Sequence, residues 1–282
     1  MLTAVPGAWR SKIKKRLRGG ELRWRRLTAA YRRLPDFLIL GAQKAGTTSL
    51  FDYVCQHPQV CPPFHKEVHY FDLSYRRGLA WYRAHFSLSG KAAHSLTGEA
   101  SPYYLYHPRV AERVARDLPE AKLLVLLRNP VDRAYSHYRF NQRWNNVNAP
   151  TFLEAIDREP ELIRPEKERM RKDPAYQSYA LQHYSYLDRG NYAVQLRHWF
   201  RHVDRSRFLI LKSEDLFQHP EPTMQKVFSF LGLTWPGDLL FRQKNATAYA
   251  PLEESMLHRL RAYYQQSVDE LTALLGPDFR WW

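Results

Sequence analysis

Residues 36–49, DFLILGAQKAGTTS, decide the predicted fold. An apolar run at 37–40 is followed by a loop of small residues that carries Lys44. From Leu50 onward apolar residues recur at helical spacing, so a helix is expected directly after the loop. A strand, a small-residue loop and a helix start favour a bound anion, because backbone N–H groups and the helix dipole converge there. The stretch therefore predicts a phosphate-binding loop.

The rest of the chain alternates strand-like and helix-like segments. Strands are expected at 95–101, 122–128 and 207–212, and the segment KLLVLLR (122–128) is apolar enough to be buried on both faces of a parallel sheet. Helices are expected at 78–86, 107–117, 131–144, 192–202, 223–231 and 253–275. The alternation predicts an α/β protein with a P-loop-like, three-layer fold, in which helices flank a mostly parallel central sheet.

The predicted domain organisation is simple. Residues 1–34 form a basic N-terminal arm, and residues 35–282 form the main domain. Residues 57–72 are expected to be an ordered loop that leads into a short extended piece. Residues 145–190 are more polar, and prolines at 150, 160, 165 and 174 are expected to divide them into short helical pieces. This helical insertion is the expected substrate side of the domain.

Charge and composition limit the location and the partners. The chain of 282 residues has a net charge of +15, and residues 1–35 hold 11 Lys and Arg against one acid, Glu21. Such an arm suits an anionic membrane surface or another polyanion, although a solvated arm is an equal interpretation. There is no apolar run of 18 residues, no secretory signal pattern and only two cysteines. We expect a cytoplasmic protein that can also bind peripherally to the membrane surface. We expect no nucleic-acid partner.

The loop differs from that of nucleotide triphosphatases. Gly41 and Gly46 keep the GxxxxG spacing, but Thr47 stands where the catalytic lysine should follow, and the cation is three residues earlier at Lys44. The next buried strand ends in Arg128 rather than in an aspartate that would hold a metal. These differences argue against Mg²⁺-ATP, and no metal is expected.

Three segments, taken together, resemble one family. LGAQKAGTTSL resembles the 5′-phosphosulfate loop of sulfotransferases that use 3′-phosphoadenosine 5′-phosphosulfate (PAPS), and LLVLLRNPVDRAYSHY resembles their 3′-phosphate motif. KEVHYFD resembles the catalytic segment of the heparan sulfate branch. The order of the segments is that of the family. The chain therefore resembles a PAPS-dependent sulfotransferase, closest in motifs to the heparan sulfate or carbohydrate branch and of the soluble, bacterial type.

The resemblance implies a donor site. Lys44 would stand near the departing phosphate, and Arg128 with Ser136 would bind the 3′-phosphate. Lys244 would come from a basic loop at 242–251 that closes over the donor. The 5′-phosphate would be held by the loop residues Ala45, Gly46, Thr47, Thr48 and Ser49. An aromatic side chain, from Trp235 or Phe241, would stack on adenine.

The resemblance also implies the catalytic groups. Glu67 would be the general base and His69 would orient it, with Lys44 assisting the leaving group. The heparan branch carries a lysine where this chain has Ala100, and Lys66 is the expected substitute. The residues assigned to the acceptor are Lys66, Asp72, Ser101 and Tyr103.

The predicted function is the transfer of a sulfuryl group from PAPS to a hydroxyl, most plausibly on a carbohydrate or glycan. Two alternatives stay open at this point. One is a P-loop nucleotide kinase or other phosphotransferase, and the other is a non-catalytic protein that binds polyanions. The acceptor is not identified by the sequence.

Overall fold

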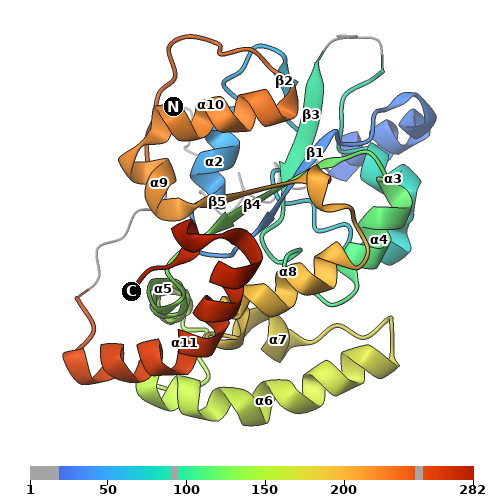
Figure 1. Cartoon of the computed structure of the whole chain (residues 1–282). Coiled ribbons are helices and arrows are strands. Elements are labelled where there is room, and N and C mark those ends of the chain that lie inside the picture. Colours follow the sequence, from blue (N-terminus) through green and yellow to red (C-terminus); the bar gives the residue numbers. More distant parts are fainter. Residues whose placement is uncertain (1–18, 90–94, 245–249) are drawn as a thin grey trace, which may run out of the picture.

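A computed structural model describes residues 19–89, 95–244 and 250–282. Within these residues one five-stranded sheet has the order β2-β3-β1-β4-β5, and every neighbouring pair is parallel (Figure 1). The predicted α/β fold is confirmed. The strands are β1 (Phe37–Gly41), β2 (Val60–Cys61), β3 (Leu96–Ala100), β4 (Lys122–Leu127) and β5 (Phe208–Lys212).

The apolar composition of the two central strands explains their position. Residues 37–40 of β1 and 123–127 of β4 are fully buried, because helices cover both faces of the sheet. The three strands expected after β1 are all present. Only β2 was missed, since two residues that pair with Leu96 and Thr97 are too few to show a pattern.

Helices cover the two faces of the sheet in pairs. On one face α2 (Thr47–Val54) packs with α10 (Pro220–Leu231), and on the other α4 (Val110–Asp117) packs with α8 (Tyr192–Phe200) (Figure 1). This arrangement follows from right-handed crossovers between parallel strands. The shorter helices are α3 (Leu79–Arg83), α7 (Tyr179–His183) and α9 (Ser213–Gln218), and 3-10 turns occur at Ala29–Tyr31, Tyr75–Arg77, Asp188–Gly190, Arg205–Arg207 and Pro277–Phe279.

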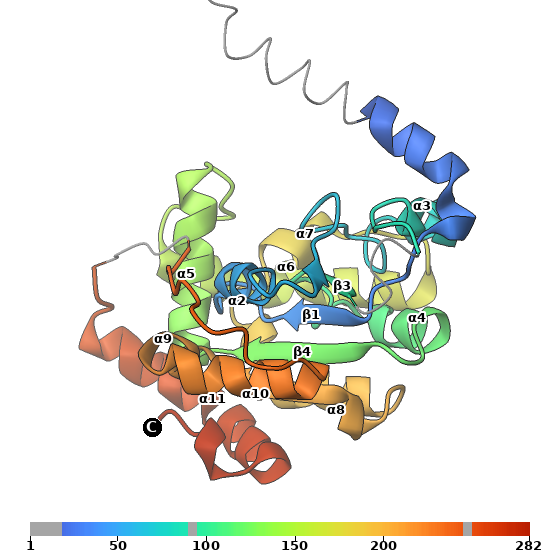
Figure 2. The ribbon, with the colours of Figure 1, turned by 90° about the horizontal axis from the view of Figure 1, so that it is seen from above.

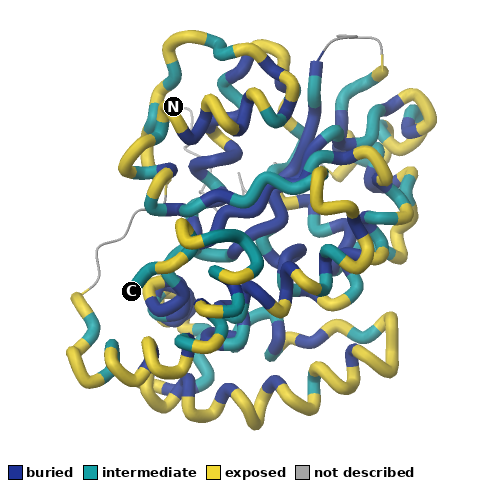
Figure 3. Tube along the Cα trace, viewed as in Figure 1, coloured by how far each residue is buried: buried dark blue, intermediate teal, exposed yellow. Residues whose placement is uncertain are grey.

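A second apolar core lies beside the sheet. It is built by α5 (Pro130–Arg143), α6 (Phe152–Lys172) and α11 (Glu254–Leu275), whose buried residues are coloured dark blue along the trace in Figure 3. The hydroxyl of Tyr264 on α11 donates to the carbonyl of Leu187 at 2.7 Å. This hydrogen bond connects α11 to the segment that leads into α8.

The prediction of several short helices in residues 145–190 was wrong. Instead α6 runs unbroken for 21 residues with Pro160 and Pro165 inside it. Each proline removes one backbone hydrogen bond, but the buried face of α6 offsets this cost by packing on α5 and α7. Thr151, directly after Pro150, caps the helix by accepting from the N–H of Glu154 at 3.2 Å.

The described part of the basic arm is attached to the domain. Residues 19–27 form a helix that lies at the edge of the molecule (Figure 2), and residues 1–18 lie outside the described residues. Arg32 forms an isolated bridge with Leu88, and its carbonyl accepts from Arg83 at 2.6 Å. Residues 19–34 are therefore in contact with the domain from which the prediction separated them.

Parallel strands bring the chemically important loops to one edge. The carboxyl ends of β1, β3, β4 and β5 lie side by side because the strands share one direction. Ligands of open α/β sheets bind at this edge. The phosphate-binding loop after β1 and Arg128 after β4 therefore meet.

Candidate active site

A cavity of about 710 Å³ opens at this edge of the sheet. Its wall includes most of the predicted site residues: Lys44, Ala45, Gly46, Thr47, Thr48, Glu67, His69, Tyr103, Arg128, Ser136 and Lys244. The structure thus brings both predicted halves, the donor loop and the catalytic segment, to one space. Ser49, Lys66, Asp72 and Ser101 are not part of the wall.

The loop after β1 has the geometry of an anion cradle. Gly46 has φ 97° and caps α2, and a Cβ at this position would lie 2.6 Å from the ring of Phe217. Only glycine therefore fits there. The N–H of Ser49 bonds to the Gly46 carbonyl at 2.9 Å, whereas the N–H groups of Thr47 and Thr48 precede the first helical hydrogen bond. These two groups are free to bind an anion.

Lys44 is held in an unusual conformation. Its φ of 71° is left-handed, which costs a non-glycine residue about 1–2 kcal/mol. Its ammonium lies 4.2 Å from the centroid of the Phe140 ring. Burial, together with the nearby charges of Arg128 and Arg143, lowers the pKa of Lys44 to about 8. An anion bound beside Lys44 would raise its pKa again and so favour the charged form.

Arg128 and Ser136 are placed by β4 and α5. Arg128 follows the last residue of β4, and its Nη1 donates to the carbonyl of Lys44 at 3.1 Å, which joins the two cationic residues. Asn129 then caps α5, because its Oδ1 accepts from the N–H of Val131 at 3.0 Å. Ser136 lies two turns along α5 and faces the same cavity.

Two carboxylates near Arg128 were not predicted. Asp132 and Glu214 both line the cavity. Glu214 accepts from the N–H of Asn129 at 2.8 Å and so fixes the start of α5. Burial raises the pKa of Asp132, although Arg128 opposes this shift. A Glu or Asp at a helix start is common in sequences, so no pattern singled out these two.

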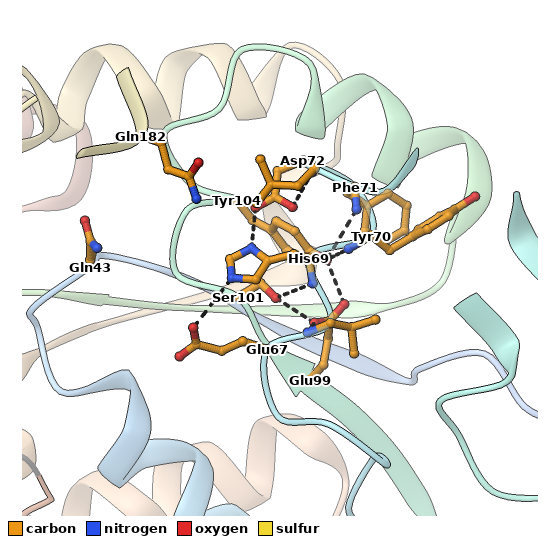
Figure 4. Close-up of polar contacts among 12 residues, drawn as sticks. Gln43, Glu67, His69, Tyr70, Phe71, Asp72, Glu99, Ser101, Tyr104 and Gln182 are labelled. Atoms are coloured by element: carbon orange, nitrogen blue, oxygen red, sulfur yellow. Dashed lines mark hydrogen bonds and ion pairs between the residues drawn. The ribbon is translucent and has the colours of Figure 1, made fainter. Parts of the chain in front are cut away.

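The catalytic segment forms a chain of charged contacts (Figure 4). The Nδ1 of His69 lies 2.7 Å from Asp72 Oδ2, and its Nε2 lies 3.5 Å from Glu67 Oε2. Burial alone would lower the pKa of His69, but hydrogen bonds to Asp72 and Glu67 raise it to about 10. Burial opposes ionisation of Glu67, yet its contacts with His69 and Lys66 lower its pKa overall. Glu67 is thus a carboxylate at neutral pH, as a general base must be.

Lys66 connects the two halves of the site. Its ammonium lies 2.5 Å from Thr48 Oγ1 on α2 and 3.4 Å from Glu67 Oε1. The residue predicted to touch the acceptor therefore bridges the donor loop and the candidate base.

Asp72 and Ser101, predicted to bind the acceptor, lie behind the cavity wall. Both are buried, and each is used by His69: Asp72 accepts from its ring, and Ser101 Oγ accepts from its N–H at 3.2 Å. Each side chain contacts His69 from the protein side and neither is part of the cavity wall, so their contact with an acceptor stays a prediction. Tyr103, by contrast, lines the cavity.

A buried carboxylate, Glu99 on β3, anchors the same segment. Its Oε2 accepts from the N–H of Val68 at 3.0 Å and from Ser101 Oγ at 2.7 Å. Its Oε1 accepts from the hydroxyls of Tyr82 and Tyr104 at 2.7 and 2.8 Å. Burial raises the pKa of Glu99, and these four donors oppose that shift.

The acceptor side contains an arginine that the sequence did not reveal. Arg189 is buried, and its guanidinium lies 4.7 Å from the Tyr103 ring centroid. Its Nη2 donates to the carbonyls of Leu181 and Gln182 at 2.6 and 2.8 Å, and its Nη1 donates to Gln43 Oε1. The cation therefore turns the Gln43 oxygen toward itself, which leaves the amide NH₂ for the cavity. The sequence does not show which arginine will be buried, because most arginines lie on the surface.

The other residues predicted for the donor site differ in whether they line the cavity. Lys244 lines the cavity, and its N–H donates to the buried Ser49 Oγ at 2.8 Å, so Ser49 holds this segment rather than facing the cavity. Residues 245–249 of the predicted closing loop lie outside the described residues. Trp235 and Phe241 pack on Phe228 and Tyr53 and are absent from the wall, where the aromatic residue beside Gly46 is Phe217.

Helices within 19–89, 95–244 and 250–282 include none with the length and apolar character needed to cross a membrane. The same ranges contain no group of three His, Cys, Asp or Glu side chains arranged to hold a metal ion.

The α/β fold brings an anion-binding loop and a carboxylate to one cavity, and comparison with known proteins identifies the family. The model of the Sulfotransferase domain matches residues 34–266, so this chain belongs to the sulfotransferase family. A solved sulfotransferase from Alicyclobacillus acidocaldarius has the same fold, with a TM-score of 0.67 at 28% identity over 86% of this chain and 96% of that one.

Curated relatives show the same relationship. The membrane-associated sulfotransferase kil1 of Dictyostelium discoideum is 26% identical over 88% of this chain and 66% of its own length. Human heparan sulfate glucosamine 3-O-sulfotransferase 6 is 32% identical over 72% of this chain and 53% of its own. The chain thus matches only part of these relatives.

The His69 contacts predict a specific pH dependence. Because the pKa of His69 rises from 6.5 to about 10 on folding, its stabilising contribution is complete below pH 6.5 and declines as the pH rises toward about 10. In Asp72→Asn the pKa of His69 should fall, and part of this decline should disappear. NMR titration of the His69 ring, assigned with His69→Gln, measures the pKa, and urea unfolding across pH 6–10 measures the stability.

Asp238→Asn, at an exposed position, is the matched control and should leave the His69 titration unchanged. A wild-type midpoint near 6.5, or the same midpoint in Asp72→Asn, would contradict the proposed contacts.

Proposed function

We propose that this sulfotransferase moves the sulfuryl group of PAPS to a hydroxyl of a carbohydrate or glycan acceptor. The observation that carries the proposal is the shared cavity, with Lys44, Arg128 and Ser136 on one side and Glu67 with His69 on the other. A donor with two phosphate groups fits the first set, and a hydroxyl that must lose its proton fits the second.

The donor is proposed from the distribution of positive charge. The N–H groups of Thr47 and Thr48 would bind the 5′-phosphate, and Arg128 with Ser136 would bind the 3′-phosphate. Lys44 would leave its position over Phe140 and neutralise the charge that develops on the departing phosphate. Its lowered pKa would rise at the same time, because the anion favours the ammonium form.

The transfer is proposed as a direct displacement. The acceptor oxygen forms a bond to sulfur while the bond from sulfur to the 5′-phosphate oxygen breaks, and the hydroxyl proton moves to Glu67. Adenosine 3′,5′-bisphosphate leaves with the electron pair of the broken bond. The protonated His69, held by Asp72, keeps Glu67 ionised until the proton arrives.

Lys66 is proposed to take the place of the lysine that the heparan branch carries where this chain has Ala100. The ammonium of Lys66 lies 2.5 Å from Thr48 Oγ1 and 3.4 Å from Glu67 Oε1, beside the cavity although not in its wall. A cation at this position would stabilise charge on the sulfonate oxygens.

The acceptor class is proposed from polar side chains in another part of the cavity wall. Gln43, Tyr103, Gln182 and His183 present amide, phenol and imidazole groups to the cavity, which suits the many hydroxyls of a sugar. Relatives that are called heparan sulfate sulfotransferases favour the same class.

The donor proposal predicts a ligand preference. Adenosine 3′,5′-bisphosphate should raise the melting temperature more than ATP with Mg²⁺, by roughly 5–10 °C at 100 times its dissociation constant. Differential scanning fluorimetry measures both shifts, and Arg128→Ala should lose most of the bisphosphate shift because the second phosphate loses its partner. A larger shift with Mg²⁺-ATP would instead favour a nucleotide kinase.

The proposed base predicts a separation of binding from catalysis. Glu67→Gln keeps the size of the side chain but cannot take a proton, so kcat should fall by about 10²–10⁴ while the bisphosphate shift persists. Release of adenosine 3′,5′-bisphosphate with acceptor present measures kcat.

Glu161→Gln, at an exposed position on α6, should behave as wild type. Full turnover in Glu67→Gln would remove Glu67 as the base.

A further inference from the structure

The N-terminal helix has one face that is fixed to the domain. Arg25 donates through Nε to the carbonyl of Ala84 at 2.6 Å and through Nη2 to that of Phe86 at 2.8 Å. Arg32 Nη1 donates to the same Phe86 carbonyl at 2.9 Å. The Arg25 guanidinium also lies 5.1 Å from the Phe64 ring centroid. The helix is therefore attached at several points, so its other face has a defined direction.

That other face is apolar and exposed. Trp24 and Leu27, three residues apart on the helix, are 61% and 83% exposed and share one face, and Tyr31, in the 3-10 turn that follows, is 73% exposed. Figure 2 shows this helix, in blue, at the edge of the molecule and away from the sheet. An amphipathic helix usually turns its apolar stripe toward the core, and this one turns it toward solvent. Such a surface marks an interaction site.

Positive charge accompanies the stripe. Arg23 and Arg26 are exposed on the same helix, and Glu21 is the one acidic residue among the first 35. The sequence immediately before the helix adds further cations at Arg10, Lys12, Lys14, Lys15, Arg16 and Arg18. The partner must therefore be anionic and must also accept apolar side chains.

We propose that residues 19–31 dock on an anionic membrane surface. Trp24, Leu27 and Tyr31 enter the boundary between headgroups and acyl chains, and Arg23 and Arg26 contact lipid phosphates. A soluble polyanion would use the arginines but not the apolar stripe, and an ordinary protein interface would not need so many cations. Only a lipid surface uses both. Because Arg25 and Arg32 fix the helix, docking would hold the whole domain at the membrane. The proposal does not depend on the donor or the acceptor.

The test is co-sedimentation of the full chain with vesicles. The chain should bind vesicles with about 30% phosphatidylserine and bind pure phosphatidylcholine weakly. Raising NaCl from about 0.1 to about 0.5 M should reduce binding without abolishing it, because salt screens the charges and not the apolar contacts. The double variant Trp24→Ala/Leu27→Ala should bind roughly tenfold more weakly at both salt concentrations.

The matched control is Trp144→Ala/Leu240→Ala, which removes an equally exposed tryptophan and leucine elsewhere and should bind vesicles as wild type does. The melting temperature of Trp24→Ala/Leu27→Ala without ligand should equal that of wild type, which shows that the domain is intact.

Three results would overturn the proposal. Vesicle binding that is lost completely at high salt and is unaffected by Trp24→Ala/Leu27→Ala would leave charge as the only contact. Absence of binding to both kinds of vesicle would remove the membrane as the partner. A concentration-dependent increase in mass that the double variant abolishes, without vesicle binding, would assign the stripe to a second copy of the chain.

Discussion

The site depends on one buried carboxylate. Glu99 lies at the end of β3, without exposure to solvent, and accepts four hydrogen bonds that offset much of its desolvation. One donor is the backbone of Val68, and another, Tyr104, accepts in turn from the N–H of Tyr70 at 2.8 Å. Glu99 thus fixes residues 68 and 70 on either side of His69, which itself has a left-handed φ of 53°. These hydrogen bonds hold residues 68–70 in place although the segment has no regular secondary structure.

From this anchor the two halves of the enzyme face each other. The sheet sets the position of the anion loop through β1 and of Arg128 through β4, while Glu99 sets the position of Glu67 and His69 through β3. Lys66 spans the gap between them by contacting both Thr48 and Glu67. The cations Lys44 and Arg128 share the cavity with Glu67, and the carboxylates Glu67 and Asp72 keep His69 charged. Such preorganised charge is the main source of catalysis in group-transfer sites.

Much of the fold and part of the site could be predicted from the sequence. Apolar runs located β1, β4 and β5, and the loop motif located Lys44 and Gly46, because strand burial and phosphate loops leave local patterns. Contacts between residues that are far apart in the sequence leave no such local pattern. Asp72 and Ser101 were assigned to the acceptor, but their contacts with His69 could not be predicted. Arg189 was not singled out, since its partners Gln43 and Leu181 are far from each other in sequence. Pro160 and Pro165 were read as helix ends because the packing that tolerates them is tertiary.

We propose that the cavity transfers a sulfuryl group from PAPS to a hydroxyl of a carbohydrate. Incubation with sulfur-35-labelled PAPS and a panel of glycans, glycolipids and phenols tests this transfer, with labelled acceptor and released adenosine 3′,5′-bisphosphate measured together. A carbohydrate acceptor should become labelled in an amount equal to the bisphosphate released, and Glu67→Gln should lower the rate of both by about 10²–10⁴. Bisphosphate release with no labelled acceptor, or labelling of phenols alone, would contradict it.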